Sequence, residues 1–331
     1  MDKKVSVVIV NWNGEKYIKK CIDSLLKVNY DNFEVIVIDN GSTDDSIKII
    51  KDSFSENVIL IENENIGYAA GANNGIKNSK GDYVLIANPD IVFGADYISK
   101  LVDSLEENKE NAAAIGKLLK YDFEKDEIIN VIDSAGISLN HKRKGFDRGQ
   151  NQVDEGQFDK STRVFGVCGA AALFKREALE KIKIDDEYFD SDFFAYKEDI
   201  DICWRLNLYG YKCLYIYDAI SYHGRGMNSS KGLINTINNR KKQSEFLKGI
   251  SFRNHYLMLY KNEINYTYKK DRLLIYSELY KYLVFFLLFD FKCFKYKKEI
   301  KKLKPKMIKK REIIMKNKKL SNNEVYELFD L

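Results

Sequence analysis

The first hundred residues of the chain repeat one pattern, in which a short aliphatic run is followed by a polar turn and then by a helix-like segment. The runs at 5–10, 33–38, 58–61 and 84–87 have the length and composition of buried strands. The intervening segments at 15–28, 47–54 and 67–78 are predicted helices. Strands that alternate with helices over short connections predict an α/β fold with a doubly wound, mostly parallel sheet flanked by helices.

The pattern becomes less regular after residue 90. Helices are predicted at 95–105 and 193–209, and strands at 112–119 and 211–217. The stretch 164–175 is apolar and rich in small residues, as expected of a strand that passes close to a ligand. Residues 121–160 are polar with scattered glycines and are predicted to form an irregular, mobile excursion beside the ligand site.

The charge of the chain is distributed unevenly. The net charge is +5, yet residues 291–320 contain fourteen Lys and Arg against two acids, so the remainder carries 5 − 12 = −7. We therefore divide the chain into an N-terminal α/β part, 1–240, and a basic, helical C-terminal extension, 241–331. The five cysteines show no metal-like spacing, and no signal peptide opens the chain, which favours free thiols and a cytoplasmic protein.

The C-terminal extension has two interpretations. Its apolar stretch at 273–291 is too short to span a bilayer and is interrupted by Glu278, Lys281 and Asp290. A helix in the membrane interface, with the lysine tail on anionic headgroups, would place the protein peripherally on the inner face of the cell membrane. Alternatively, the helices pack on the α/β part. Nucleic acid is disfavoured as a partner because the neighbouring apolar run suits lipid.

Polar side chains follow three of the predicted strands. Asn11 and Asn13 come after the first, Asp39 after the second, and Asn88 and Asp90 after 84–87. Ligands of open α/β sheets bind at the carboxyl ends of such strands, and this set suits a nucleotide. The intervening proline stiffens the turn before Asp90, whose carboxylate is a candidate ligand for a divalent cation. Ordinary turn and capping roles are the alternative.

Glycines at 67, 71 and 75 fall four residues apart and share one helix face. Such a face permits close approach either of a ligand or of another segment of the backbone. The segment matches neither the GxGxxG fingerprint nor the GxxxxGK[ST] loop, so dehydrogenase and P-loop functions lose their main support.

Three acids open the predicted helix at 193–209. Glu198 and Asp201 are neighbours at i, i+3, whereas Asp199 points elsewhere and is a candidate general base. Arg205 lies four residues after Asp201 and is expected to bind it. His223 sits beside glycines after a strand, as a surface histidine or as a contact to metal or phosphate.

An ordered series of motifs resembles the glycosyltransferase family 2 enzymes of the GT-A fold, and within them the rhamnosyltransferase-like group that builds bacterial surface polysaccharides. The resemblance covers 5–231 and rests on VVIVNWNG, VIDNGSTDDS, NIGYAAGANNGI, IANPD, CGAAALFKREAL, YKEDIDICWRL and YHGRGMNSS. It implies a GT-A sheet with Asp199 as catalytic base, and Asp90 and His223 as ligands of Mg²⁺ or Mn²⁺. Asn88 stands where the family has a first acid, a departure that weakens the metal site. The expected donor-binding residues are Asn11, Asn13, Asp39, Gly67, Asn73, Asn88, Gly169 and Ala170, with Glu198, Asp201 and Arg205 in support.

The same resemblance implies a reaction. A sugar, with L-rhamnose from dTDP-L-rhamnose as the leading candidate, would pass with inversion from a nucleotide diphosphate to a saccharide, expected to be polyprenyl-diphosphate-linked. The alternative is a catalytically idle nucleotide-sugar-binding scaffold, motivated by Asn88 and the basic tail. A nucleotidyltransferase is disfavoured because no Gly/Arg-rich phosphate loop follows the first strand.

Overall fold

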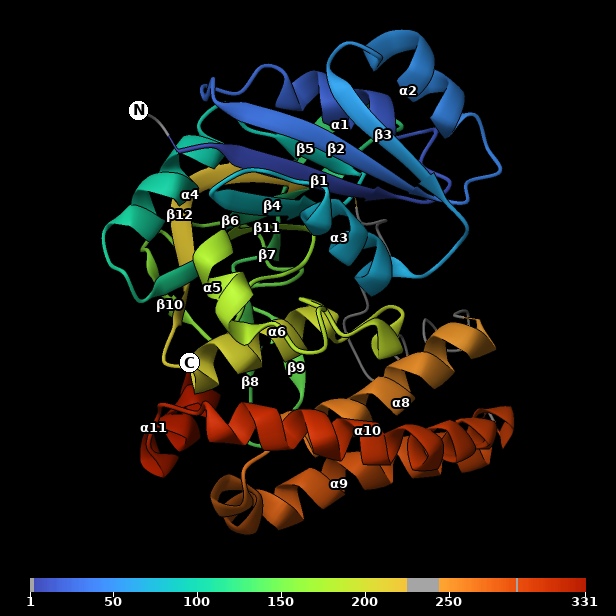
Figure 1. The fold of residues 1–331 in the computed structure, drawn as a ribbon, viewed down its shortest axis with the longest axis vertical. Coiled ribbons are helices and arrows are strands. Elements are labelled where there is room, and N and C mark those ends of the chain that lie inside the picture. Colours follow the sequence, from blue (N-terminus) through green and yellow to red (C-terminus); the bar gives the residue numbers. More distant parts are fainter. Residues whose placement is uncertain (1–2, 225–243, 290) are drawn as a thin grey trace.

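A computed structural model describes residues 3–224, 244–289 and 291–331 of the protein. It contains a mixed sheet flanked by helices, with a group of C-terminal helices at one end of the molecule (Figure 1). The main path of the sheet is β10-β12-β6-β11-β4-β1-β2-β3. The predicted α/β class, with a mostly parallel sheet and a C-terminal helical extension, is therefore confirmed.

The parallel half of the sheet corresponds to the repeating pattern of the first hundred residues. It consists of β1 (Val5–Asn11), β2 (Phe33–Asn40), β3 (Val58–Asn63) and β4 (Tyr83–Ala87). Strand β1 is central, buried along its whole length, and parallel to both β2 and β4. Its register pairs Asn11 with Asp39, so the polar residues that follow these strands meet at one edge.

The second half of the sheet brings distant segments to the same edge. Strand β11 (Ala171–Lys175) runs antiparallel between β4 and β6 (Asn111–Asp122). Strand β12 (Lys212–His223) is parallel to β6 and extends past the predicted end at 217. Its last residues pair with β5 (Ile91–Phe93), with His223 opposite Ile91, while β10 (Thr162–Val164) covers its other end. Because His223 lies opposite Ile91, it also lies close to Asp90, the residue before Ile91.

Four helices follow the strands at nearly the predicted places: α1 (Ile18–Leu25), α2 (Ser46–Phe54), α3 (Tyr68–Lys77) and α4 (Tyr97–Glu106). A further helix, α5 (Arg176–Ile182), was not predicted. The glycine face of α3 packs on the sheet: a Cβ atom on Gly75 would lie 2.1 Å from Val8 Cγ1, and one on Gly71 would lie 2.9 Å from Asn40 Nδ2. Close packing, and not ligand approach, thus accounts for these two glycines.

The expectation of an irregular excursion at 121–160 was wrong. The segment contains β7 (Glu127–Ser134), which pairs with β6, and the hairpin of β8 (Ile137–Leu139) and β9 (Gly145–Asp147). A few apolar residues, among them Ile132, are completely buried there. Tertiary burial of these few side chains outweighs a composition that by itself favours loops.

The helix predicted at 193–209 begins later than expected. A 3₁₀ turn at Ser191–Phe193 precedes α6 (Glu198–Leu208). Between them, Phe194, Tyr196 and Lys197 have φ angles of 64°, 69° and 75°. Non-glycine residues rarely adopt this left-handed region, and such strained backbone concentrates at functional sites.

The C-terminal helices pack on the N-terminal α/β part of the chain. They are α8 (Glu245–Asn262), α9 (Asn265–Phe289), α10 (Tyr296–Lys316) and α11 (Asn322–Glu327). Buried residues such as Leu257 and Met307 belong to the same hydrophobic core as the sheet. The predicted boundary at 240/241, positions 225–230 of the last motif, and Asp290 lie outside the described residues. In the described part of the chain, each helix is too short or too polar to cross a membrane.

Buried ion pairs join this extension to the core. Lys261 of α8 binds Asp190 and Asp201, with Nζ to oxygen distances of 2.7 and 2.8 Å, and its side chain is 2% exposed. Lys310 of α10 binds the other oxygen of Asp190 at 2.6 Å. Asp201 belongs to α6, so the pairs fix the extension to the helix that also carries Asp199.

We expect Lys261→Ala to lower the free energy of unfolding by roughly 3–5 kcal/mol, because it leaves two carboxylates buried without their shared cation. Chemical denaturation of the two proteins measures the difference. Lys281→Ala is the matched control, since this exposed lysine pairs with Glu278 at 3.3 Å and should contribute less than about 1 kcal/mol. Equal effects of the two substitutions would contradict the anchoring role of Lys261.

Candidate active site

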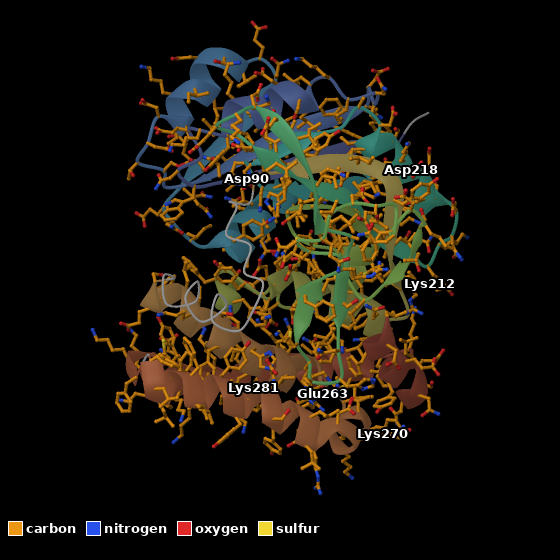
Figure 2. All side chains as sticks on the ribbon, turned by 180° about the vertical axis from the view of Figure 1, so that it is seen from behind. Asp90, Lys212, Asp218, Glu263, Lys270 and Lys281 are labelled. Atoms are coloured by element: carbon orange, nitrogen blue, oxygen red, sulfur yellow. The ribbon has the colours of Figure 1, made fainter. Side chains whose placement is uncertain are left out.

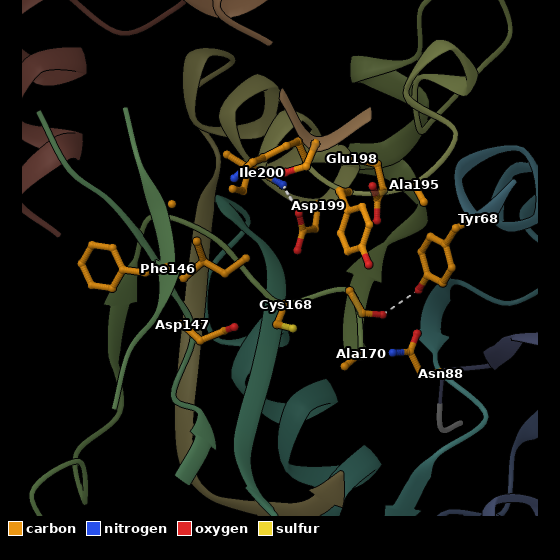
Figure 3. A pocket seen from close by; sticks show the side chains of 16 residues that line it. Tyr68, Asn88, Phe146, Asp147, Cys168, Ala170, Ala195, Glu198, Asp199 and Ile200 are labelled. Atoms are coloured by element: carbon orange, nitrogen blue, oxygen red, sulfur yellow. Dashed lines mark hydrogen bonds between the residues drawn. The ribbon is translucent and has the colours of Figure 1, made fainter. Parts of the chain in front are cut away.

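A cavity of about 410 Å³ lies where the sheet edge meets the loop before α6 and the β8–β9 hairpin (Figure 3). Its walls come from segments far apart in the sequence, including the turn after β4, the loop before β11, α6 and α8. Five of the residues predicted from the sequence line it: Asn88, Gly169, Ala170, Glu198 and Asp199. The cavity therefore joins the two stretches that the motifs single out, one after β4 and one at the start of α6.

The acids at the start of α6 are in a setting that disfavours charge. Burial raises the pKa of Asp199, and the negative charge of Asp147 raises it further. Burial, followed by the charge of Asp199, raises the pKa of Glu198 to about 8. Figure 3 shows Asp199 and Asp147 directed into the cavity, while the amide of Ile200 donates to Asp199 Oδ1 at 2.8 Å. A carboxylate with a raised pKa that faces a cavity is suited to accept a proton.

Tyr68 connects α3 to the loop before β11. Its hydroxyl donates to the carbonyl of Gly169 at 2.8 Å, shown by the dashed line from Tyr68 in Figure 3. Burial raises the pKa of Tyr68 well above its ordinary value, and the charges of Glu198, Asp199 and Asp90 add to the effect. The negative charges of Asp90 and Asp199 thus act in the same direction on the pKa of this one hydroxyl group.

Asp90 and His223 form a pair at the edge of the sheet. Nε2 of His223 lies 3.2 Å from Asp90 Oδ1, and Nδ1 is 2.7 Å from Asp133 Oδ2. Burial by itself would lower the pKa of His223, but Asp90 and Asp133 outweigh it and raise the pKa to about 9. Asp133 also fixes the orientation of the ring, so that Nε2 faces Asp90.

The Asp90–His223 pair fits a divalent cation in part. A carboxylate oxygen and an imidazole nitrogen 3.2 Å apart can both reach one ion, and an acid behind the histidine is the usual second partner of a metal-binding imidazole. However, no cluster of three or more His, Cys, Asp or Glu side chains suited to a metal occurs in the part of the chain that the structure describes. Two protein ligands suit an ion such as Mg²⁺ or Mn²⁺, which completes its shell with water and phosphate oxygens.

The polar residues after β1 and β2 form a connected group beside the cavity. Asn11 Nδ2 donates to Asp39 Oδ1 at 2.8 Å, and the Ser42 amide donates to Asp39 Oδ2 at 2.9 Å. Asn13 Oδ1 accepts from the Thr43 amide at 2.8 Å, so the two loops are tied together. Asn11 and Asp39 are buried and Asn13 is exposed, and none of the three lines the cavity.

Two residues predicted to bind the donor have contacts within the protein. Asn73 Oδ1 accepts from the amides of Tyr188 and Phe189, and its Nδ2 donates to the Phe189 carbonyl at 2.7 Å. A Cβ atom on Gly67 would lie 2.5 Å from the Phe194 ring, so this glycine permits close packing. Both residues thus support the segment before α6, and donor binding by either stays a prediction.

The supporting residues of α6 lie where the sequence predicted. Arg205 Nε donates to Asp201 Oδ2 at 3.1 Å, as expected from the i, i+4 spacing. Asn262 Nδ2 of α8 donates to Asp201 Oδ1 at 2.7 Å. The carboxylate of Asp201 is completely buried, so it positions α6 and does not reach the cavity.

The strained loop before α6 is held by α8. Asn254 Nδ2 lies within 2.8 Å of the carbonyl oxygens of Phe193, Ala195 and Tyr196. The last two of these residues line the cavity, as does Ser251 on the preceding turn of α8. The C-terminal extension is thus part of the site and not only an appendage.

Sequence reasoning missed three residues of this region: Tyr68, Asp133 and Asp147. Tyr68 lies within one of the motifs, where an aromatic side chain among small residues was the available signal. Asp133 and Asp147 belong to the segment expected to be irregular, and no sequence pattern marks them. Their roles depend on the folding of β7 and β9 against the core.

Comparisons with known proteins identify relatives of the chain. The chain is 30% identical to the glycosyltransferase GlyA of Streptococcus pneumoniae over 223 residues, which are 64% of this chain and 31% of GlyA. It is 28% identical to a dolichyl N-acetyl-alpha-D-glucosaminyl phosphate glucuronosyltransferase of Methanococcus voltae, over 63% of each chain. The aligned part therefore spans less than two thirds of either relative.

The fold is shared with solved structures. A mannosyltransferase from Pyrobaculum calidifontis, in complex with GDP-Man and Mn²⁺, superimposes with a TM-score of 0.53 at 15% identity, covering 95% of this chain and 74% of that one. This similarity identifies the fold as GT-A. Residues 6–183, more than half of the chain, match the model of glycosyl transferase family 2, and residues 146–247 match that of glycosyl transferase family group 2. The chain belongs to glycosyl transferase family 2.

Proposed function

We propose that the protein is an inverting, metal-dependent glycosyltransferase that moves a sugar from a nucleotide diphosphate to a saccharide hydroxyl. One observation carries the proposal: the cavity lined by Asp199 is also lined by Asn88, two residues before the Asp90 that pairs with His223. A potential base and the turn that leads into a potential cation site thus border one space. Family membership and the GT-A fold support the same reaction class.

In the proposed reaction, Asp199 accepts the proton of the acceptor hydroxyl. The acceptor oxygen then forms a bond to the anomeric carbon of the donor, and the bond from that carbon to the diphosphate oxygen breaks. The nucleoside diphosphate departs with the electron pair, and the sugar is inverted in this single displacement. A raised pKa of Asp199, caused first by burial and then by Asp147, makes it a better proton acceptor than an exposed carboxylate.

Asp90 and His223 would hold Mg²⁺ or Mn²⁺ at the diphosphate. A bound cation there neutralises the charge that develops on the leaving group. Asn11, Asn13 and Asp39 would receive the base and ribose at the neighbouring strand ends, with Asn88, Gly169 and Ala170 around the sugar. The Pyrobaculum mannosyltransferase, in complex with GDP-Man and Mn²⁺, supports a nucleotide sugar and a divalent cation as ligands of this fold.

The substrates are proposed from the resemblance of the motifs to rhamnosyltransferase-like enzymes. The donor is dTDP-L-rhamnose, and the acceptor is a saccharide on a polyprenyl diphosphate in bacterial surface polysaccharide synthesis. The dolichyl phosphate in the name of the Methanococcus relative supports a lipid-linked acceptor.

A lipid-linked acceptor agrees with the surface of the C-terminal helices. Along α9, Leu273, Tyr280 and Leu287 are at least 60% exposed. Lys270 and Lys281 lie on the same helix, in the part of the molecule away from the sheet that carries Asp90 (Figure 2). Apolar side chains flanked by lysines suit an anionic membrane surface, so we place the protein peripherally on the inner face of the cell membrane.

A catalytically idle scaffold that binds nucleotide sugars is the second candidate. Asn88 supports it, since an amide supplies no charge for a cation. In this case Asp199 and Glu198 would take no part in chemistry, and the protein would neither transfer sugar nor hydrolyse the donor.

Substitution of the base separates the two candidates. Asp199→Asn should lower kcat by at least about a hundredfold, because an amide cannot accept the acceptor proton, while donor affinity measured by calorimetry changes little. Transfer or donor hydrolysis is followed by release of the nucleoside diphosphate. Asp103→Asn on the exposed side of α4 is the control. Undiminished turnover in Asp199→Asn would remove the base assignment, and a wild-type protein without turnover would favour the scaffold.

The rise of kcat/KM on the acidic side of its pH profile should depend on Asp147. Because Asp147 raises the pKa of Asp199, Asp147→Asn should lower that pKa and shift the rise of kcat/KM toward lower pH. A profile from pH 4.5 to 8.5 measures the shift, with Asp103→Asn again as the control. A profile that moves to higher pH, or not at all, would contradict the electrostatic coupling of the two acids.

Metal dependence should follow the Asp90–His223 pair. We expect His223→Gln and Asp90→Asn each to raise the half-saturating concentration of Mn²⁺ by about tenfold or more, because each removes one of two protein ligands. Titration of activity with Mn²⁺ in metal-free buffer gives the values. Unchanged Mn²⁺ requirements in both variants would place the cation elsewhere.

A further inference from the structure

A second cavity, of about 460 Å³, lies among the C-terminal helices and shares no lining residue with the candidate active site. Four tyrosines and four aliphatic side chains from α8, α9 and α10 form most of its wall. The tyrosines are Tyr256, Tyr260, Tyr268 and Tyr276. Its size and its mainly apolar wall are typical of a ligand pocket.

The polar side chains of this second cavity leave an excess of positive charge. Lys304 and Arg311 line it, and neither has a carboxylate within ion-pair distance among the described residues. Lys304 Nζ lies 4.7 Å from the centre of the Tyr260 ring. The one acid in the wall, Glu263, is already paired with Arg143, through contacts of 2.6 and 3.1 Å. Arg311 donates to the backbone carbonyl of Glu263 and, at 3.2 Å, to Asn265 Oδ1, and both acceptors are neutral. The cavity therefore offers a ligand two cations that have no ion-pair partner among the described residues, one of which is already hydrogen-bonded within the protein.

The wall of the second cavity continues into the exposed apolar face of α9. Tyr276 lines the cavity and is 55% exposed, and Leu273 and Tyr280 on the same face are 77% and 67% exposed. Both acids of α9, Asp271 and Glu278, are buried, so this face presents apolar and basic groups. A second copy of the chain would bring basic surfaces together here, whereas an anionic amphiphile complements both the charge and the apolar area.

We propose that this second cavity binds a long-chain lipid phosphate, with the phosphate at Lys304 and Arg311 and part of the chain among the tyrosines and aliphatic side chains. The apolar wall removes the chain from water, and the two cations pair with the phosphate oxygens. Neither half of the ligand satisfies the cavity alone, since an alcohol leaves the cations unpaired and a free phosphate leaves the apolar wall uncovered.

The biological role of this site rests on the proposed function, because a lipid-linked acceptor carries such a phosphate. Helix α8 contributes Ser251 to the active-site cavity and Tyr256 to the second cavity. At 1.5 Å and about 100° per residue, these positions are about 8 Å apart along the helix axis and about 140° apart around it. The two cavities therefore lie on different sides of α8, and a saccharide attached to a lipid phosphate held here would reach Asp199 by passing around this helix.

Binding is tested on the full chain by titration calorimetry with dodecyl phosphate, below the concentration at which it aggregates. We expect saturable 1:1 binding, with dodecanol and inorganic phosphate each at least about tenfold weaker. Lys304→Glu should weaken binding of dodecyl phosphate by at least about tenfold, because it reverses one of the two charges. Lys309→Glu is the matched control: this exposed lysine of α10 lies outside the cavity, and its reversal should change the affinity less than about twofold.

A second variant tests the apolar half. Ile308 lines the cavity and is 38% exposed, so Ile308→Trp should fold normally while filling the space, and should also weaken binding by about tenfold. Equal weakening by Lys304→Glu and Lys309→Glu, or unchanged affinity in Ile308→Trp, would overturn the proposal. Binding to phosphatidylglycerol vesicles without binding to monomeric dodecyl phosphate would also overturn it, in favour of a flat membrane surface. Donor binding is measured separately on the wild-type protein, so failure of the proposed transfer function is distinguishable from failure of the lipid site.

Discussion

The arrangement of the site depends on the buried ion pairs that Lys261 makes with Asp190 and Asp201. Burial by itself would raise the pKa of Asp190, but Lys261 and Lys310 outweigh burial and keep that pKa below its ordinary value. Such pairs cost desolvation and contribute little to stability when compared with apolar packing, yet removal of one partner is severe. In this protein, the ion pairs hold α8 against Asp201 of α6, and they hold both α8 and α10 against Asp190. The start of α6, with Glu198 and Asp199, is thereby held against the sheet edge.

Because of these ion pairs, the basic C-terminal extension is a structural part of the core. Some of its lysines face solvent, but Lys261 and Lys310 are almost completely buried and neutralise acids of the core. Asn254 in turn holds carbonyl groups of the left-handed segment before α6, where strained backbone needs external support. The extension therefore has two faces. One completes the active-site cavity, and the other presents the exposed side of α9 and the second cavity.

The candidate active site is an acidic region. Asp147, Glu198 and Asp199 line the cavity, and Asp90 and Asp133 lie on either side of His223. Burial and the charges of neighbouring acids raise the pKa values of Asp199 and Glu198. A concentration of carboxylates of this kind is unfavourable in a protein by itself. It becomes favourable when a cation and hydrogen-bonding sugar hydroxyls occupy the space, which agrees with the proposed reaction.

The sequence by itself determined the parallel half of the sheet, the residues at its strand ends, and the pairing of Asp201 with Arg205, because periodicity and i, i+4 spacing are local properties. It also indicated Asp199 as the acid that stands apart from its neighbours. Only the tertiary structure decided the roles of Gly67 and Asn73, since packing against Phe194 and hydrogen bonds to Tyr188 leave no trace in nearby residues. The same holds for β7 to β9, for Asp133 behind His223, and for the face of α9 that remains exposed. The contacts of Asp133, Asn73 and Gly67 join residues 90, 115 and 127 positions apart, and local patterns carry no information about which distant surface a segment will meet.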